Sequence, residues 1–129
     1  MLNTAKTVGF AATAKPTEAK RFYQHSLGLE LTEESPFALV FRSGNTTVRI
    51  QIVPTVISPP YTSLGWEVAD IQATVQQLAS RGVEFQFFEG LPQNDDGIWS
   101  TPDGAQIAWF LDPDGNTLSL TEHGSASAS

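Results

Sequence analysis

The sequence contains no cysteine, which excludes disulfide bonds and thiol chemistry. This absence fits a reducing compartment, and we predict a cytoplasmic protein. Long apolar runs are also missing, since none approaches the roughly 18 residues of a membrane span. The first residues lack the basic and apolar segments of a secretory signal. We therefore expect no membrane association.

Basic residues are scarce: seven Lys and Arg stand against 14 Asp and Glu, for a formal net charge of −7. Proteins that bind nucleic acid use Lys and Arg to contact phosphates, so nucleic acid is not an expected partner. Histidine is scarcer still, with His25 and His123 as its two members. The chain therefore offers little imidazole for metal binding.

What is present is organised by an internal repeat. The first half predicts a strand at 8–12, a helix at 18–23 and strands at 29–31, 37–41 and 47–52. Pro16 suits a first helical turn, and Gly28 suits a left-handed residue at the helix end.

The second half predicts the same order, with a strand at 64–68, a helix that begins after Asp70, and strands at 83–85, 105–111 and 117–121. Asp70 is a good N-cap, and Ile71, Val75 and Leu78 form the apolar stripe of the helix. Gly82 ends this helix as Gly28 ends the first.

The repeat predicts an α+β fold of two βαβββ units, with curved mixed sheets around a central cleft and helices outside. Neither half has enough residues to bury both its sheet and its helix alone, so we expect one domain over 1–122. The units span about 5–53 and 61–122, joined by a proline-rich linker at 54–60. A low-complexity tail at 123–129 is predicted to be disordered.

Three motifs follow each other along the chain: RFYQHSLGL at 21–29, WEVADI at 66–71 and WFLDPDGNTLSL at 109–120. In this order, with the repeat, they resemble the vicinal oxygen chelate superfamily, which comprises glyoxalases, bleomycin resistance proteins and dioxygenases. The resemblance covers about residues 5–122. Bacterial members of the superfamily are among the proteins that the chain resembles. It implies the fold above and a small ligand on the concave sheet surface.

In metal-dependent members, the resemblance implies, four strand positions carry His or Glu ligands. Aligned on the motifs, these positions fall at Thr7, Arg49, Ser63 and Ser119. None is a normal ligand for a divalent transition metal, and the charge of Arg49 opposes a cation. We therefore predict no metal site and no cofactor.

Period-two alternation assigns the strand residues to two faces. The predicted inner face is polar and small, and holds Thr7, Gly9, Ala11, Arg49, Gln51, Ser63, Gly65, Glu67, Thr117, Ser119 and Thr121. The opposite face is apolar and should lie under the helices; it holds Val8, Phe10, Val48, Ile50, Ile52, Leu64, Trp66, Val68, Leu118 and Leu120.

Each candidate side chain has two interpretations. Arg49 could clamp an anionic group bidentately or form an internal ion pair with Glu67. Glu67 could be a catalytic general base if burial raised its pKa, or a structural partner. Trp99 and Trp109 could stack on a flat ligand or belong to the core.

The predicted ligand-binding set is therefore Arg49, Gln51, Ser63, Glu67, Ser119, Trp99 and Trp109. Residues 112–116 carry two carboxylates at the spacing of a tight turn, without the further ligands of a calcium loop.

The first functional hypothesis is metal-independent binding of a small molecule, which is anionic if Arg49 clamps it. The alternatives are an enzyme of the lyase, isomerase or dioxygenase type, and an interaction subunit with a vestigial pocket. We also expect a homodimer, because three Trp and eight Phe exceed what one small core needs.

Overall fold

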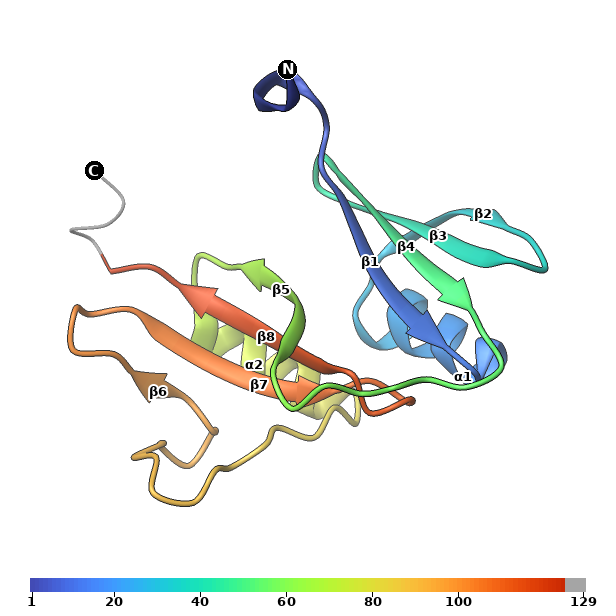
Figure 1. Cartoon of the computed structure of the whole chain (residues 1–129). Coiled ribbons are helices and arrows are strands. Elements are labelled where there is room, and N and C mark those ends of the chain that lie inside the picture. The colour runs from blue at the N-terminus through green and yellow to red at the C-terminus, as the bar shows by residue number, and fades with distance from the viewer. Residues whose placement is uncertain (125–129) are drawn as a thin grey trace. The chain divides into compact units, whose positions relative to one another are not determined.

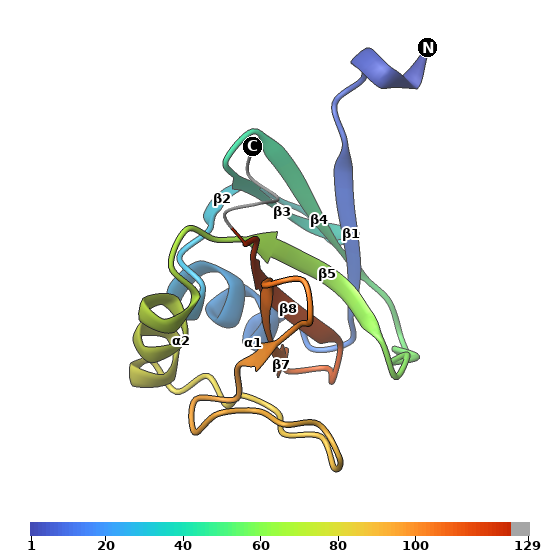
Figure 2. The same cartoon turned by 90° about the vertical axis from the view of Figure 1, so that its left-hand side faces the viewer.

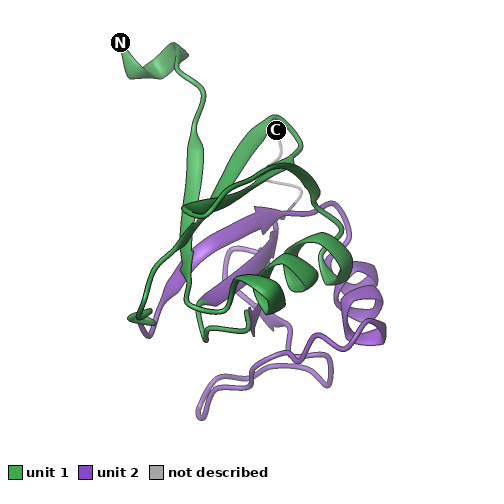
Figure 3. Cartoon of the chain, turned by 90° about the vertical axis from the view of Figure 1, so that its right-hand side faces the viewer, with its two compact units in different colours: residues 1–58, 112–116 green, residues 59–111, 117–129 purple. Residues whose placement is uncertain are grey.

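The computed structural model describes residues 1–124, and it divides into two compact units. Unit 1 comprises residues 1–58 and 112–116, and unit 2 comprises residues 59–111 and 117–129 (Figure 3). The boundary at Ser58 and Pro59 falls within the proline-rich stretch 54–60. Residues 125–129 of the predicted tail lie outside the described range.

Unit 1 holds one four-stranded sheet, one α-helix and two short helical segments of other types (Figure 1). Its elements are η1 (Leu2–Thr4), β1 (Val8–Thr13), α1 (Pro16–Arg21), the π-turn η2 (Phe22–Ser26), β2 (Glu30–Glu34), β3 (Ala38–Ser43) and β4 (Thr46–Ile52). The strand order is β1-β4-β3-β2, with β1 parallel to β4 and the other pairs antiparallel.

Unit 2 repeats this topology with the order β5-β8-β7-β6, and β5 is parallel to β8. Its elements are β5 (Thr62–Glu67), α2 (Ile71–Ser80), β6 (Trp99–Ser100), β7 (Gln106–Leu111) and β8 (Thr117–Glu122). The prediction of an α+β fold with two βαβββ units is confirmed. No helix of the described residues is long and apolar enough to cross a membrane.

The helix signals in the sequence act as predicted. The Asp70 carboxylate accepts a hydrogen bond from the backbone N–H of Ala73 at 3.0 Å, which caps α2. α2 lies beside β7 and β8 (Figure 2). Its buried residues are Ile71, Val75 and Leu78. Gly28 and Gly82 follow the helices with φ of 77° and 91°, a conformation that favours glycine.

The predicted strand at 83–85 was wrong in extent. A single bridge joins Phe85 to Phe110, and the chain then leaves the sheet until β6 at Trp99. The fourth strand of this sheet is thus reduced to one bridge and a two-residue strand. A long loop occupies the place that β2 fills in unit 1.

The predicted faces of β1 were also wrong. β1 pairs Phe10 with Arg49 and Ala11 with Ile50, and residues paired across strands point to the same face. Gly9 and Ala11 therefore belong to the apolar face, whereas Phe10, 51% exposed, shares the face of Arg49. Fully buried Thr13, two residues beyond Ala11, fixes this alternation.

The predicted tight turn at 112–116 is present, and it belongs to unit 1 although β7 and β8 belong to unit 2. Its Asp112 carboxylate is buried and accepts a hydrogen bond from the Tyr23 hydroxyl at 2.7 Å. It also accepts from the Asn116 amide at 2.8 Å and from the backbone N–H groups of Asp114 and Asn116. Buried charge is tolerated when it is hydrogen-bonded in this way.

Replacement of the buried tyrosine should weaken unit 1. We expect Tyr23→Phe to lower the free energy of unfolding by about 1.5–3 kcal/mol, the range for a hydrogen bond to a charged group. Urea unfolding with an unchanged m value measures the loss. Tyr61→Phe is the matched control, because Tyr61 is 68% exposed and makes no hydrogen bond within residues 1–124.

The same pair of variants carries a pH signature. Burial first, and then the Asp112 carboxylate, raise the pKa of the Tyr23 hydroxyl above its ordinary value of 10.0. The folded protein therefore holds the Tyr23 proton more tightly than the unfolded chain does. The contribution of Tyr23 to stability is complete below pH 10 and falls as the pH rises above 10. Above pH 10, the free energy of unfolding should fall less steeply with pH in Tyr23→Phe than in the wild-type protein, whereas Tyr61→Phe should behave as the wild type. Equal slopes in all three proteins would contradict this role of Tyr23.

Candidate functional site

The open face of the second sheet brings four predicted site residues together. The register sets two rows across the strands: Gly65–Ser119–Trp109 and Glu67–Thr121–Ile107–Trp99. Residues of one row share a face, and so do residues two apart along a strand. Glu67, Ser119, Trp99 and Trp109 therefore lie on the same face.

The opposite face of this sheet is apolar, as predicted. Leu118 and Phe110 are fully buried, and Leu120 is 3% exposed. Trp66 stacks on Phe110 with ring centroids 6.4 Å apart. α2 covers this face of the sheet. Core packing alone therefore explains why the residues on this face are apolar.

Three aromatic rings gather on the open face. Trp99 and Trp109 stack with centroids 6.2 Å apart and planes 26° apart. Phe88 meets Trp109 edge-on at 5.3 Å and 88°. Phe88 was not among the predicted site residues; its one signal in the sequence is the aromatic run Phe85-Gln86-Phe87-Phe88 within a polar segment.

The floor beside Trp109 is flat. A Cβ atom on Gly65 would lie 2.7 Å from the Ser119 hydroxyl oxygen, so the hydroxyl fills the space that a side chain at 65 would need. Ser119 itself is 8% exposed. A planar group could thus approach this part of the sheet closely.

Glu67 lies at the opposite edge of the face from Trp99. Its side chain is 72% exposed and its carboxylate is 3.7 Å from the His123 imidazole. This exposure removes the desolvation on which the general-base hypothesis depended. Ser63 falls at a register shift between Thr62 and Leu64, and lies exposed on the edge strand outside both rows.

The carboxylate of Asp103, also in unit 2, has a lowered pKa. The hydroxyl of Thr101 donates to the Asp103 carboxylate, which lowers the pKa of Asp103. This contact lies in the exposed turn before β7 and is a local turn interaction.

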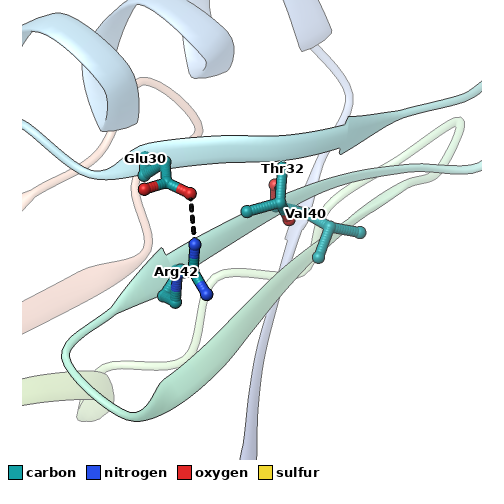
Figure 4. Close-up of polar contacts among 4 residues, drawn as sticks. All are labelled: Glu30, Thr32, Val40 and Arg42. Atoms are coloured by element: carbon teal, nitrogen blue, oxygen red, sulfur yellow. Dashed lines mark hydrogen bonds and ion pairs between the residues drawn. The ribbon is translucent and has the colours of Figure 1, made fainter.

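Arg49 and Gln51 lie on the open face of the first sheet, in rows with Phe10 and Ala12. Arg42, on the same face, forms an ion pair with Glu30 at 2.6 Å (Figure 4). Arg49 is half-buried, and within the described part of unit 1 its guanidinium has no ion pair or hydrogen bond. An anion that reached this face could therefore pair with the guanidinium bidentately.

A separate groove of about 420 Å³ lies in unit 1 near the start of α1. The pair Lys20–Glu34, 3.0 Å apart, lies at its wall, and Leu39 and Ile52 are among its lining residues. None of the predicted site residues lines it.

The donor chemistry does not fit a divalent metal. Of the four aligned positions, Thr7 precedes β1, Ser63 lies in the bulge, and Arg49 and Ser119 occupy the open faces. Hydroxyls and a guanidinium are poor ligands for such an ion. No group of three His, Asp or Glu side chains within residues 1–124 could share one.

Elemental analysis should therefore find well under one transition-metal ion per chain in the purified protein. A ligand that binds the native state raises the melting temperature. Since we expect no metal to bind, one equivalent of zinc, nickel, iron or manganese should leave the melting temperature unchanged. About one ion per chain, retained through dialysis and lost in Glu67→Gln, would contradict this expectation.

The family model described as Glyoxalase/Bleomycin resistance protein/Dioxygenase superfamily matches residues 7–120. Among curated proteins, none matches the sequence.

Solved structures share the fold. A glyoxalase/bleomycin resistance protein/dioxygenase from Alicyclobacillus acidocaldarius has a TM-score of 0.71 at 16% identity, covering 96% of this chain and 95% of that chain. Lactoylglutathione lyase from Agrobacterium tumefaciens has 0.70 at 15%, covering 92% and 93%. TnmS3, an antibiotic binding protein from Streptomyces sp. CB03234, has 0.69 at 22%, covering 95% and 98%.

Proposed function

Because the chain belongs to the glyoxalase/bleomycin resistance protein/dioxygenase superfamily, we propose that it binds a small organic molecule without a metal ion. The binding surface is the open face of the second sheet. The cytoplasmic location and the homodimer expected from the sequence stay predictions.

The aromatic group on this face carries the proposal. Trp99 and Trp109 are stacked on a face whose neighbouring residues are Ser119, Thr121 and Gly65, and α2 packs on the other side. Two half-buried tryptophans outside the helix-covered core favour a flat ligand, since aromatic rings gain from offset stacking. TnmS3, which binds an antibiotic, supports the use of this fold for binding.

An enzyme of the lyase, isomerase or dioxygenase type is the alternative. The fold of lactoylglutathione lyase supports it. The exposure of Glu67 and the lack of fit to a metal weigh against it. We therefore place binding ahead of catalysis.

Charge divides unevenly between the units. Unit 2 holds eight of the 14 carboxylates and one of the seven Lys and Arg residues, so it alone accounts for the net charge of −7. Unit 1 holds six of each and is formally neutral. The field around the tryptophans therefore favours a neutral or cationic ligand over an anion.

Arg49 supports a separate anionic contact. Its guanidinium is permanently charged and has no ion pair within unit 1. A carboxylate or phosphate group of a ligand would supply the anion for such a pair. The anionic ligand predicted from the sequence thus depends on unit 1, and the aromatic ligand depends on unit 2.

Three tricyclic probes test the aromatic site: 9-aminoacridine as the cation, phenazine as the neutral ring and phenazine-1-carboxylate as the anion. A Trp66→Phe background leaves Trp99 and Trp109 as the fluorescent reporters. We expect quenching with affinity in the order cation, neutral, anion. Trp109→Ala should weaken each by roughly tenfold, equivalent to about 1.4 kcal/mol.

Phe37→Ala is the control, because Phe37 is an exposed aromatic residue of unit 1 at 75% exposure. Equal affinities in the wild-type protein, Trp99→Ala and Trp109→Ala would show that the probes bind elsewhere. A thermal-shift screen of planar metabolites without any stabilisation would refute the binding function.

Arg49→Met separates the two contacts. The substitution breaks no ion pair within unit 1, so the free energy of unfolding should change by less than about 0.5 kcal/mol. It should abolish the thermal stabilisation by simple carboxylate and phosphate ions and leave the affinity for 9-aminoacridine unaffected. Arg42→Met, which breaks an exposed pair, is the matched control. Equal stabilisation by these anions in the wild-type protein and in Arg49→Met would rule out the Arg49 clamp.

A further inference from the structure

The segment between α2 and β7 is the place where the internal repeat breaks. In unit 1, nine residues (29–37) separate Gly28 from β3, and β2 occupies most of them. In unit 2, 23 residues (83–105) separate Gly82 from β7, with β6 as their one strand. Long irregular loops within a small domain are usually functional.

We infer that residues 86–98 form the specificity loop of the open face, and that Gln93 is the positioning residue that holds it. The inference rests on the proposed function for the identity of the binding face. It adds the part of the chain that decides which planar molecules fit there.

The side chain of Gln93 joins the two arms of the loop. Its carbonyl oxygen accepts the backbone N–H of Phe88 at 2.7 Å. Its amide nitrogen donates to the carbonyls of Gln86 at 2.9 Å and Gly97 at 2.8 Å. Both N–H donors of the glutamine amide and one of the two acceptor sites on its oxygen are therefore used.

Gln93 thereby contacts the backbone of Phe88 within the loop and that of Trp99, the residue that follows the loop. The atom it fixes in the first arm is the backbone nitrogen of Phe88, whose ring meets Trp109 edge-on. The backbone of Gln93 bridges that of Trp99, whose ring stacks on Trp109. A side-chain amide thus substitutes for the missing strand ladder and sets the spacing of the three rings.

Gly97 closes the loop tightly. Its φ of 84° favours glycine, and a Cβ there would meet the Phe85 Cβ at 3.3 Å and the Phe87 ring at 3.6 Å. The Asn94 side chain accepts from the backbone N–H groups of Asp96 and Ile98, at 3.0 and 2.9 Å. The loop is therefore ordered before a ligand arrives, which favours selection by shape.

The chemical class follows from the loop's content. Phe87 and Phe88 are 60% and 45% exposed, and the loop carries Glu89, Asp95 and Asp96 without a Lys or Arg. Aromatic faces and carboxylates together attract flat organic cations. The spacing of Phe88 from the Trp99–Trp109 pair would decide how large a fused ring is accepted.

The test compares two flat cations of different size, 9-aminoacridine with three rings and 4-aminoquinoline with two, in the Trp66→Phe background. Gln93→Ala should change the ratio of their dissociation constants by about fivefold or more, since it shifts the fit of the pocket. It should also weaken the circular-dichroism couplet of the stacked Trp99–Trp109 pair in the free protein. Gln72→Ala, on the exposed face of α2, should change neither.

A purely structural role for Gln93 would lower the melting temperature and reduce both affinities alike. An unchanged ratio together with an unchanged couplet overturns the inference, whatever happens to stability. If Gln93→Ala fails to fold, Gln93→Asn, which shortens the reach by one methylene, takes its place under the same criteria.

Failure of the proposed function is distinguishable. If Trp109→Ala abolishes probe binding and Gln93→Ala leaves the ratio and couplet unchanged, only the role of the loop is lost. If the wild-type protein binds neither cation, the binding function fails for this class of ligand and the inference about ligand size fails with it.

Discussion

The buried carboxylate of Asp112 is the contact on which unit 1 depends. Tyr23 and Asn116 donate to it from their side chains, and two backbone N–H groups complete it. Without these donors an ionised group at this depth would be strongly destabilising. The neighbouring Asp114 accepts from the Thr13 hydroxyl and from the Ala14 N–H at 2.9 Å, where β1 passes into α1. One loop from late in the sequence therefore organises the first strand, the first helix and their junction.

The repeated scaffold and the proposed chemistry lie in different parts of the sequence. In both units the apolar face of the sheet comes from alternate positions of the two central strands, with Phe41 and Phe110 both fully buried. The open faces differ, because the first carries Arg49 and Gln51 and the second carries two tryptophans. The shared topology explains the shared core, and the residues proposed to contact a ligand lie where the two units differ.

Local signals were sufficient for the regular elements. The Asp70 cap, the stripe of Ile71, Val75 and Leu78, and the glycines after each helix act as the sequence indicates. Alternation also placed Arg49, Glu67 and Ser119 on open faces, because a strand covered by a helix on one side has a strict period of two.

Errors arose where partners distant in the sequence decide the outcome. The faces of β1 follow its pairing with β4 and the burial of Thr13, although Val8 and Phe10 are its most apolar residues. The short strand at 83–85 is interrupted because Gln93 and Asn94 offer side-chain hydrogen bonds in place of a ladder. Phe88 joins the aromatic group through that irregular loop, for which no periodicity exists.

The stacking of Trp99 on Trp109 shows why site residues are harder to predict than a core. Each tryptophan alone is explained equally well by packing, and nine residues (100–108) lie between them in the sequence. They meet because β6 pairs Trp99 with Ile107, which puts both rings on one side of the sheet. The hydrophobic effect acts on every apolar side chain, so core positions can be recognised from the sequence pattern. The identity of a binding residue depends on its ligand, which the sequence pattern does not contain. Unit 2 holds eight carboxylates and one arginine, and under the proposed binding function this balance of charge would favour a neutral or cationic ligand over an anion.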